Sequence, residues 1–245
     1  MMKCQRHHLI HKDNSSTDWH QHPKGQLFWI SRGVLSIEAG SEQWMITSGA
    51  VGWIPPDVRH RTEVVSECDG MILMLPAAQL PHASAFPRLV ALNPVSDAII
   101  RRLESVGSTK VTEPQQRLLG VLMDEINAAD DSVMRLPMPT DKRLRLIADA
   151  LLNRPDDRRE QPQLACHYGL SPRHMSRLFV QQTGMTFARW RQLARVLSSL
   201  RWLARHESVT QTALACGFEN TSSYITAFKH YFGVTPGKYV HRDTA

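Results

Sequence analysis

The chain has 245 residues, of which 42% are hydrophobic and 21% charged, with a formal net charge of +6 at neutral pH. This composition is typical of a soluble globular protein with one or two domains. The longest uninterrupted apolar run, Met71 to Leu75, is too short for a membrane helix of about 20 residues. The charged start of the chain lacks the apolar core of a signal peptide, so we expect a cytoplasmic protein. The four cysteines form no Cys-x-x-Cys pair, which argues against a disulfide framework or a cysteine-based zinc site.

Short β-strands are predicted over residues 26–75. The segments QLFWISRGVLSIEAG, EQWMITSGAVGWIPP and GMILMLP are apolar or alternating, and glycine, proline and aspartate separate them. Strands of this kind with turn residues between them are typical of an all-β barrel or sandwich. We therefore expect a β-domain over residues 1–93.

Two helices are predicted next. PVSDAIIRRLESVG and PQQRLLGVLMDEINAAD each begin with proline and repeat apolar residues three and four positions apart. In the second segment an apolar stripe comprises Leu118, Leu119, Leu122 and Ile126. The stripe predicts either a face in the protein core or the seam of a dimer. Residues 94–140 are expected to form a helical connector, with dimerisation through residues 114–130.

The segment RLPMPT, residues 135–140, predicts the domain boundary because its prolines interrupt both kinds of periodicity. The segments beyond it show helical spacing and capping residues, which predicts an all-α domain over residues 141–245. This part carries a formal net charge of +8, whereas residues 1–140 carry −2. The asymmetry favours a C-terminal domain that binds a polyanion, and a basic surface without a partner is the alternative.

Two segments of the C-terminal part resemble one another. LACHYGLSPRHMSRLFVQQTG (164–184) and ALACGFENTSSYITAFKHYFG (213–233) share a short apolar helix pattern, a glycine, a polar residue and an amphipathic helix pattern. Gly169 and Gly217 suit the tight turns, and Ser171 and Asn220 suit helix N-caps. The pattern predicts two helix-turn-helix units, joined by a long helix over residues 187–205.

The second helix of each unit has two faces at helical spacing. The inward face is expected to contain Met175, Leu178, Phe179, Gln182, Tyr224, Ala227, Phe228 and Tyr231. The predicted DNA contacts on the outward face are Arg173, Ser176, Arg177, Thr221, Ser222, Ile225, Thr226 and Lys229. Arginine can bind guanine O6 and N7, isoleucine can contact the thymine methyl group, and small hydroxyl residues let the backbone approach phosphates.

Residues 141–242 resemble the DNA-binding domain of the AraC/XylS family of bacterial transcription regulators. The resemblance rests on LSPRHMSRLFVQQTG and on ACGFENTSSYITAFKHYFGVTPGKY, which matches the family signature over nearly its whole length. It implies seven helices, with two helix-turn-helix units across a linker helix and both recognition helices in adjacent major-groove turns. Many members have a long polar residue where this chain has Thr226, preceded by Ile225. The second unit is therefore expected to discriminate less between bases than the first, which has Arg173 and Arg177.

In the N-terminal part, DWHQHPKGQLFWISRG and GAVGWIPPDVRHR resemble the two cupin motifs. In a metal-binding cupin the corresponding ligands would be His20, His22, Gln26 and His60, with Gln26 in place of the usual glutamate. Such a site could hold a divalent metal such as nickel, zinc or iron. The alternative is that these histidines line a pocket or form hydrogen bonds without a metal, as in many regulatory cupins of the family.

Tryptophans alternate with polar residues on the same predicted strands. Trp29, Trp44 and Trp53 predict barrel core, and Trp29 and Trp53 are the alternative candidates for lining an effector pocket with the histidines.

These patterns predict a cytoplasmic, two-domain transcription regulator without enzyme activity: an all-β, cupin-like sensor barrel with a helical connector, followed by an all-α double helix-turn-helix domain. The expected partners are double-stranded promoter DNA, a small-molecule or metal effector, a second copy of the chain and RNA polymerase. Neighbouring transporter or efflux genes are the targets that the family resemblance implies, under activation or repression. A metal-dependent cupin enzyme fused to a DNA-binding domain is one alternative, and an architectural DNA-binding protein without an effector is another.

Overall fold

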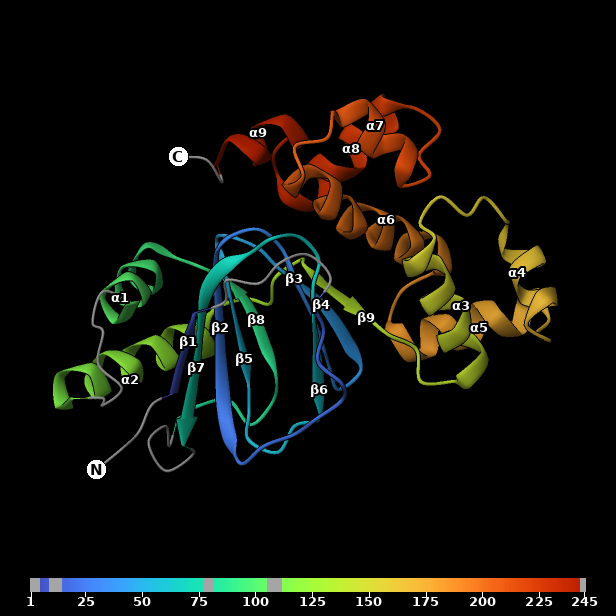
Figure 1. Ribbon diagram of the computed structural model, residues 1–245. Coiled ribbons are helices and arrows are strands. Elements are labelled where there is room, and N and C mark those ends of the chain that lie inside the picture. The colour runs from blue at the N-terminus through green and yellow to red at the C-terminus, as the bar shows by residue number, and fades with distance from the viewer. Residues whose placement is uncertain (1–4, 9–14, 77–81, 105–111, 243–245) are drawn as a thin grey trace. The chain divides into compact units, whose positions relative to one another are not determined.

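The computed structural model describes residues 5–8, 15–76, 82–104 and 112–242 (Figure 1). The chain divides into two compact units. The first unit comprises residues 1–40 and 44–135, and the second comprises residues 41–43 and 136–245.

The described strands form two antiparallel β-sheets, and most of their residues belong to the first unit. The first sheet has the order β1 (Gln5–His8), β7 (Asp69–Pro76), β2 (Lys24–Arg32), β5 (Ala50–Ile54) and β8 (Arg88–Ala91). The second has the order β6 (His60–Val64), β3 (Leu35–Ala39), β4 (Glu42–Ile46) and β9 (Arg135–Pro137). Residues 25–30 of β2 are all buried, which requires cover on both faces of the strand. The predicted β-rich N-terminal part is confirmed.

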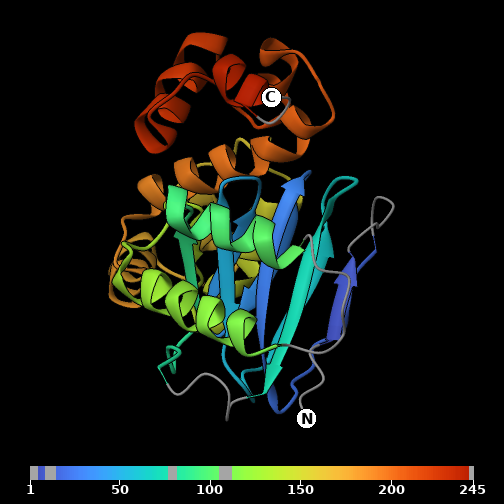
Figure 2. The same ribbon diagram turned by 90° about the vertical axis from the view of Figure 1, so that its left-hand side faces the viewer.

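Helices α1 (Pro94–Glu104) and α2 (Glu113–Ala128) supply the cover on one face of the first sheet (Figure 2). Their buried residues join a core with side chains of β2, β5 and β7, and α2 contributes Leu119, Leu122, Met123 and Ile126. For Leu119, Leu122 and Ile126, the interpretation as a core face is confirmed. A dimer interface on α2 would have to use the face opposite these residues, where Val121 is exposed.

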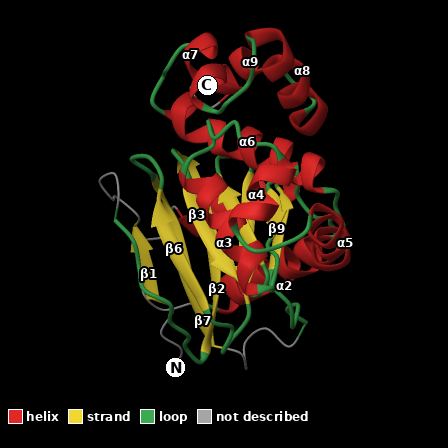
Figure 3. Ribbon diagram, turned by 90° about the vertical axis from the view of Figure 1, so that its right-hand side faces the viewer, coloured by secondary structure: helices red, strands yellow, loops and turns green. Residues whose placement is uncertain are grey.

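The second unit contains seven described helices (Figure 3). They are α3 (Lys142–Asn153), α4 (Gln161–His167), α5 (Pro172–Thr183), α6 (Phe187–Ala204), α7 (Val209–Ala215), α8 (Thr221–Phe232) and α9 (Pro236–Arg242). The pair α4–α5 and the pair α7–α8 are joined by the long helix α6, as the sequence predicts. Across the described parts of both units, no helix is long and apolar enough to cross a membrane.

The second unit begins at residue 136, within the segment 135–140 that the prolines mark as the boundary, and the backbone of residues 137–141 contacts its helices. Trp190 of α6 is buried, and its indole N–H donates to Pro137 O at 2.7 Å. Gln182 Oε1 of α5 accepts hydrogen bonds from the backbone N–H groups of Thr140 and Asp141, both at 2.9 Å. These bonds connect the entering chain to both α5 and α6.

A fragment that starts at residue 141 should therefore be less stable than one that starts at residue 136. Without Pro137 the indole N–H of Trp190 loses its acceptor, and an unpaired buried donor costs about 1–3 kcal/mol. Urea unfolding of the two fragments, followed by circular dichroism, measures the difference. Trp190→Phe removes this donor, so it should narrow the gap between the two fragments. Equal stabilities of the unsubstituted fragments would show that the Pro137 bond contributes nothing.

Candidate DNA-binding helices and histidine cluster

Helix α5 is positioned by its two ends and by one buried face. Ser171 is the N-cap, and its hydroxyl oxygen accepts from His174 N–H at 3.2 Å. Gly184 ends the helix in the left-handed conformation that glycine favours. Met175 and Phe179 are fully buried, and the Phe179 ring lies against Trp190 of α6 with centroids 5.3 Å apart. The expected inward face of the helix is confirmed for these residues.

The opposite face of α5 exposes Arg173, Ser176 and Arg177. The side chain of Arg173 has no hydrogen bond or ion pair with any described residue, so its guanidinium group is available for a ligand. Arg177 Nη2 lies 3.3 Å from His174 Nδ1 on the same helix. The two arginines are four residues apart, which places them one above the other along the exposed face.

Ser176 is less free than its exposure indicates. Its hydroxyl donates to Pro172 O at 3.0 Å and accepts from the Gln161 side-chain amide at 2.6 Å. A hydroxyl has one proton, so Ser176 can accept a further hydrogen bond but cannot donate to a phosphate in this arrangement. Gln161, at the start of α4, is therefore a positioning residue that the sequence analysis missed.

Helix α8, like α5, is positioned by its capped ends and by one buried face. Asn220 is the N-cap, and its side chain accepts from Ser223 N–H at 2.8 Å. Tyr224 and Phe228 are fully buried, and the Tyr224 hydroxyl donates to Ser199 Oγ of α6 at 3.0 Å. Burial raises the pKa of Tyr224, which keeps the hydroxyl protonated for this bond. The bond connects α8 to α6.

The face of α8 opposite these buried rings carries the remaining predicted DNA contacts. Ser222, Thr226 and Lys229 are exposed, and Thr221 and Ile225 are partly buried. Thr221 Oγ1 lies 3.4 Å from Thr210 Oγ1 of α7, which joins the two helices of this unit. All eight predicted DNA contacts thus lie away from the buried faces of α5 and α8.

Two other arginines of the second unit have a structural role. Arg195 donates to the carbonyl oxygens of Pro155 and Asp157 at 3.1 and 3.0 Å, and Arg191 donates to Asp157 O and Arg159 O. Burial lowers the pKa of both guanidinium groups. These contacts hold the loop between α3 and α4 against α6. Part of the positive charge of the second unit therefore binds backbone carbonyls of the same unit and is not free for a ligand.

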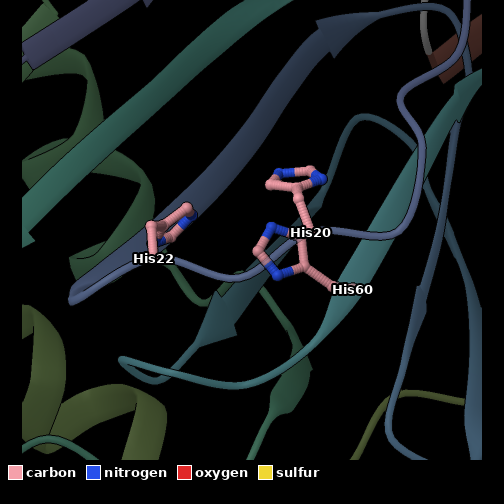
Figure 4. Close-up of side chains that lie close together, drawn as sticks. All are labelled: His20, His22 and His60. Atoms are coloured by element: carbon pink, nitrogen blue, oxygen red, sulfur yellow. The ribbon is translucent and has the colours of Figure 1, made fainter.

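In the first unit, three histidines lie close together (Figure 4). His20 and His60 face each other across an antiparallel bridge and exchange backbone hydrogen bonds of 3.0 and 2.9 Å. His22 follows two residues after His20, and its carbonyl accepts from Asp57 N–H at 2.9 Å. One potential ligand nitrogen from each ring lies within 4.8 Å of the other two.

Backbone carbonyls determine the tautomer of each ring. The Nδ1 atoms of His20, His22 and His60 lie 2.8, 2.6 and 2.8 Å from the carbonyl oxygens of Asp18, Lys24 and Val58, respectively. A carbonyl only accepts, so each Nδ1 bears a proton, and in the neutral form of each ring Nε2 retains a lone pair. His22 Nε2 and His60 Nε2 are buried and have no hydrogen-bond partner among the described residues. Burial lowers the pKa of His60 to about 4, so this ring is neutral at physiological pH.

The other residues expected near the histidines divide between the two faces of the first sheet. Gln26 is buried, and in the described part of the chain its Oε1 has no hydrogen-bond partner. Trp29 and Trp53 belong to the core that α1 and α2 cover, and the Trp53 indole donates to Ser84 O at 2.9 Å. Gln26 and Trp29 are three residues apart on β2, so they project to opposite faces. The expectation that Trp29, Trp44 and Trp53 are core is confirmed.

Both units match known protein families. A family model described as the AraC-like ligand binding domain matches residues 5–122, and a helix-turn-helix domain model matches residues 164–242. The histidine cluster lies within the first range, and α5 and α8 lie within the second.

Individual relatives match over most of the chain. The HTH-type transcriptional regulator NimR of Escherichia coli K12 is 29% identical over 236 residues, which is 95% of this chain and 85% of that protein. The HTH-type transcriptional regulator RipA of Corynebacterium glutamicum is 26% identical over 217 residues, which is 87% of this chain and 61% of that protein. The structure of unsaturated fatty acid bound ToxT from Vibrio cholerae aligns with a TM-score of 0.43 and 12% identity, over 98% of this chain and 95% of its own.

Proposed function

Because the chain belongs to the AraC family of HTH-type transcriptional regulators, we propose that it reads promoter DNA with α5 and α8 and that an effector in its first unit controls promoter occupancy. The observation that carries the proposal is the paired construction of the second unit. Two helix-turn-helix units pack on one linker helix, and each exposes polar or basic side chains on its recognition helix. A pair of recognition helices on one support suits two successive major-groove segments of DNA.

The two recognition helices would read DNA differently. Arg173 and Arg177 on α5 can each offer two donors to guanine O6 and N7, the commonest specific contact in the major groove. On α8, Thr226 offers a hydroxyl and Ile225 an apolar surface for a thymine methyl group, while Ser222 and Lys229 suit phosphates. In this proposal most of the base discrimination comes from α5.

Regulation would follow from unequal effector affinity for two arrangements of the protein. An effector that binds one arrangement more tightly shifts the population toward that arrangement. The coupling free energy between the two sites then changes the affinity for DNA, and with it the occupancy of the promoter. Within this scheme residues 1–93 sense the effector, residues 94–140 connect and dimerise, and residues 141–245 bind DNA. The protein would act without catalysis, in the cytoplasm, on a gene for a neighbouring transporter or efflux protein, together with RNA polymerase.

Binding of the full-length protein to DNA from the region upstream of its own gene tests this function. We expect a footprint over two adjacent major-groove segments and at least about 1,000-fold tighter binding than to random DNA at the same salt concentration. Equal affinity for both DNAs, with the same salt dependence, would contradict the proposal and favour an architectural protein. Turnover of a substrate by the first unit would favour the cupin enzyme.

A further inference from the structure

We propose that His20, His22 and His60 bind a divalent first-row transition metal, such as Zn²⁺, Ni²⁺ or Co²⁺, with Nε2 of each imidazole as the ligand atom. The metal would be the effector, or part of the effector site, of the regulator described above. The proposal depends on that function only for this regulatory role, because the binding site itself stands on the geometry of the three rings.

Backbone pairing brings the three side chains to one place. Opposed residues of an antiparallel pair project from the same face, so the reciprocal hydrogen bonds between His20 and His60 direct both rings to one side. The ring centroids of His20 and His60 are 4.4 Å apart, and those of His22 and His60 are 5.1 Å apart. Figure 4 shows His20 and His22 on the segment that leads into β2, with His60 beside them at the start of β6.

The hydrogen bonds of the rings match those of metal ligands. A histidine that binds a metal through one nitrogen commonly donates its other ring N–H to a backbone carbonyl or carboxylate, which fixes the ring and its tautomer. All three rings have this arrangement at Nδ1. The three Nε2 lone pairs therefore remain for an external partner.

The unsatisfied nitrogens also limit what that partner can be. Within residues 5–8, 15–76, 82–104 and 112–242, no group forms a hydrogen bond with the buried His22 Nε2 or His60 Nε2, and unpaired buried polar atoms destabilise a fold. One water molecule has two protons and cannot donate to three acceptors, whereas one metal ion accepts all three lone pairs. His20 and His22 are partly exposed, so an ion can reach the site from solvent.

The ligand set selects a class of ion. Imidazole nitrogen favours zinc, nickel, cobalt, copper and iron, whereas magnesium and calcium prefer several oxygen ligands. Among the described residues, the cluster contains three histidines and no carboxylate or thiolate. Metal–nitrogen bonds of about 2.0–2.1 Å place ligand nitrogens about 3.0–3.4 Å apart. Because the potential ligand atoms lie within 4.8 Å of one another, binding requires the widest pair to approach by up to about 1.4–1.8 Å.

Metal binding by the untagged full-length protein tests the site. After loading with Co²⁺ or Zn²⁺ and dialysis, we expect one equivalent of metal per chain by elemental analysis, ligand-field absorption bands for Co²⁺, and a higher Tm with metal. His20→Ala and His22→Ala should each weaken binding by about 100-fold or more and abolish the rise in Tm. Circular dichroism of the metal-free variants confirms that they fold.

Two controls separate this site from other histidines. His167→Ala changes an exposed histidine of the second unit and should leave the stoichiometry at one. The triple variant His7→Ala, His8→Ala and His11→Ala, which changes the other N-terminal histidines, should also retain one equivalent.

Three results would overturn the metal site: no retained metal in folded protein, undiminished binding by the His20 and His22 variants, or loss of binding in a control. Promoter binding by the same protein, with and without added metal, tests the proposed function separately. Protein that binds its promoter specifically but retains no metal would refute the metal site alone. Protein that retains metal but does not distinguish its promoter from random DNA would refute the regulatory function alone.

Discussion

Gly217→Ala is expected to lower the free energy of unfolding of the second unit by about 3 kcal/mol. Gly217 has φ of +74°, where a residue with a Cβ atom costs roughly 1–2 kcal/mol. A Cβ atom there would also lie 2.7 Å from Pro155 O and 2.9 Å from Asp156 Cα. The loop that carries these atoms is held by Arg195, so it cannot move away without loss of hydrogen bonds.

Gly169→Ala is the matched control, because Gly169 occupies the same place in the first helix-turn-helix unit. Its φ of +69° is nearly identical, but apart from its chain neighbours no described residue has an atom within 4 Å of the added Cβ. We expect a loss of only about 1 kcal/mol, from backbone conformation alone. Urea unfolding of the full-length variants, followed by circular dichroism, compares the two sites. Equal losses would show that the Pro155 contact has no energetic effect.

Arg177→Ala is expected to weaken binding to the specific promoter site by about 1–3 kcal/mol and to relax the preference at one base pair. The reason is that a guanidinium group can bind guanine through two parallel hydrogen bonds, and alanine offers none. Binding to a set of sites with single base-pair changes, at constant salt concentration, measures both effects.

Two further variants separate base reading by Arg177 from phosphate binding. Arg177→Lys keeps the charge but loses the planar fork of donors, so it should lose most of the preference while binding random DNA as the wild type does. Arg101→Ala removes the same charge from an exposed position on α1 of the first unit and should leave the preference unchanged. Equal weakening on specific and random DNA by Arg177→Ala would instead make Arg177 a phosphate contact.

The repeated units could be predicted from the sequence because their signals are local. N-caps, C-terminal glycines and helical periodicity all lie within about 20 residues. In the structure Ser171 and Asn220 are the N-caps, as predicted, and Gly184 and Gly233 are the C-caps. The buried faces followed from the same spacing, as Phe179 and Phe228 show.

Features that depend on contacts between distant segments could not be predicted from these local patterns. Alternation along β2 shows that Gln26 and Trp29 point to opposite faces, but it does not show which face the helices cover. The bond between Gln161 and Ser176 joins two helices, and the crowding at Gly217 arises from a loop about 60 residues earlier. The histidine positions were suggested by motif resemblance, whereas their shared tautomer required the carbonyl positions.

The unlike faces of α5 and α8 have a consequence for the direction of the protein on DNA. The two helix-turn-helix units follow one another in a single chain. The first presents Arg173 and Arg177 where the second presents Ile225 and Thr226. A single chain built in this way has no internal two-fold symmetry, so the site proposed for one chain need not be palindromic. One chain on one site would therefore have a defined direction along the DNA. Reversing the site would exchange the positions of its two helix-turn-helix units relative to the promoter.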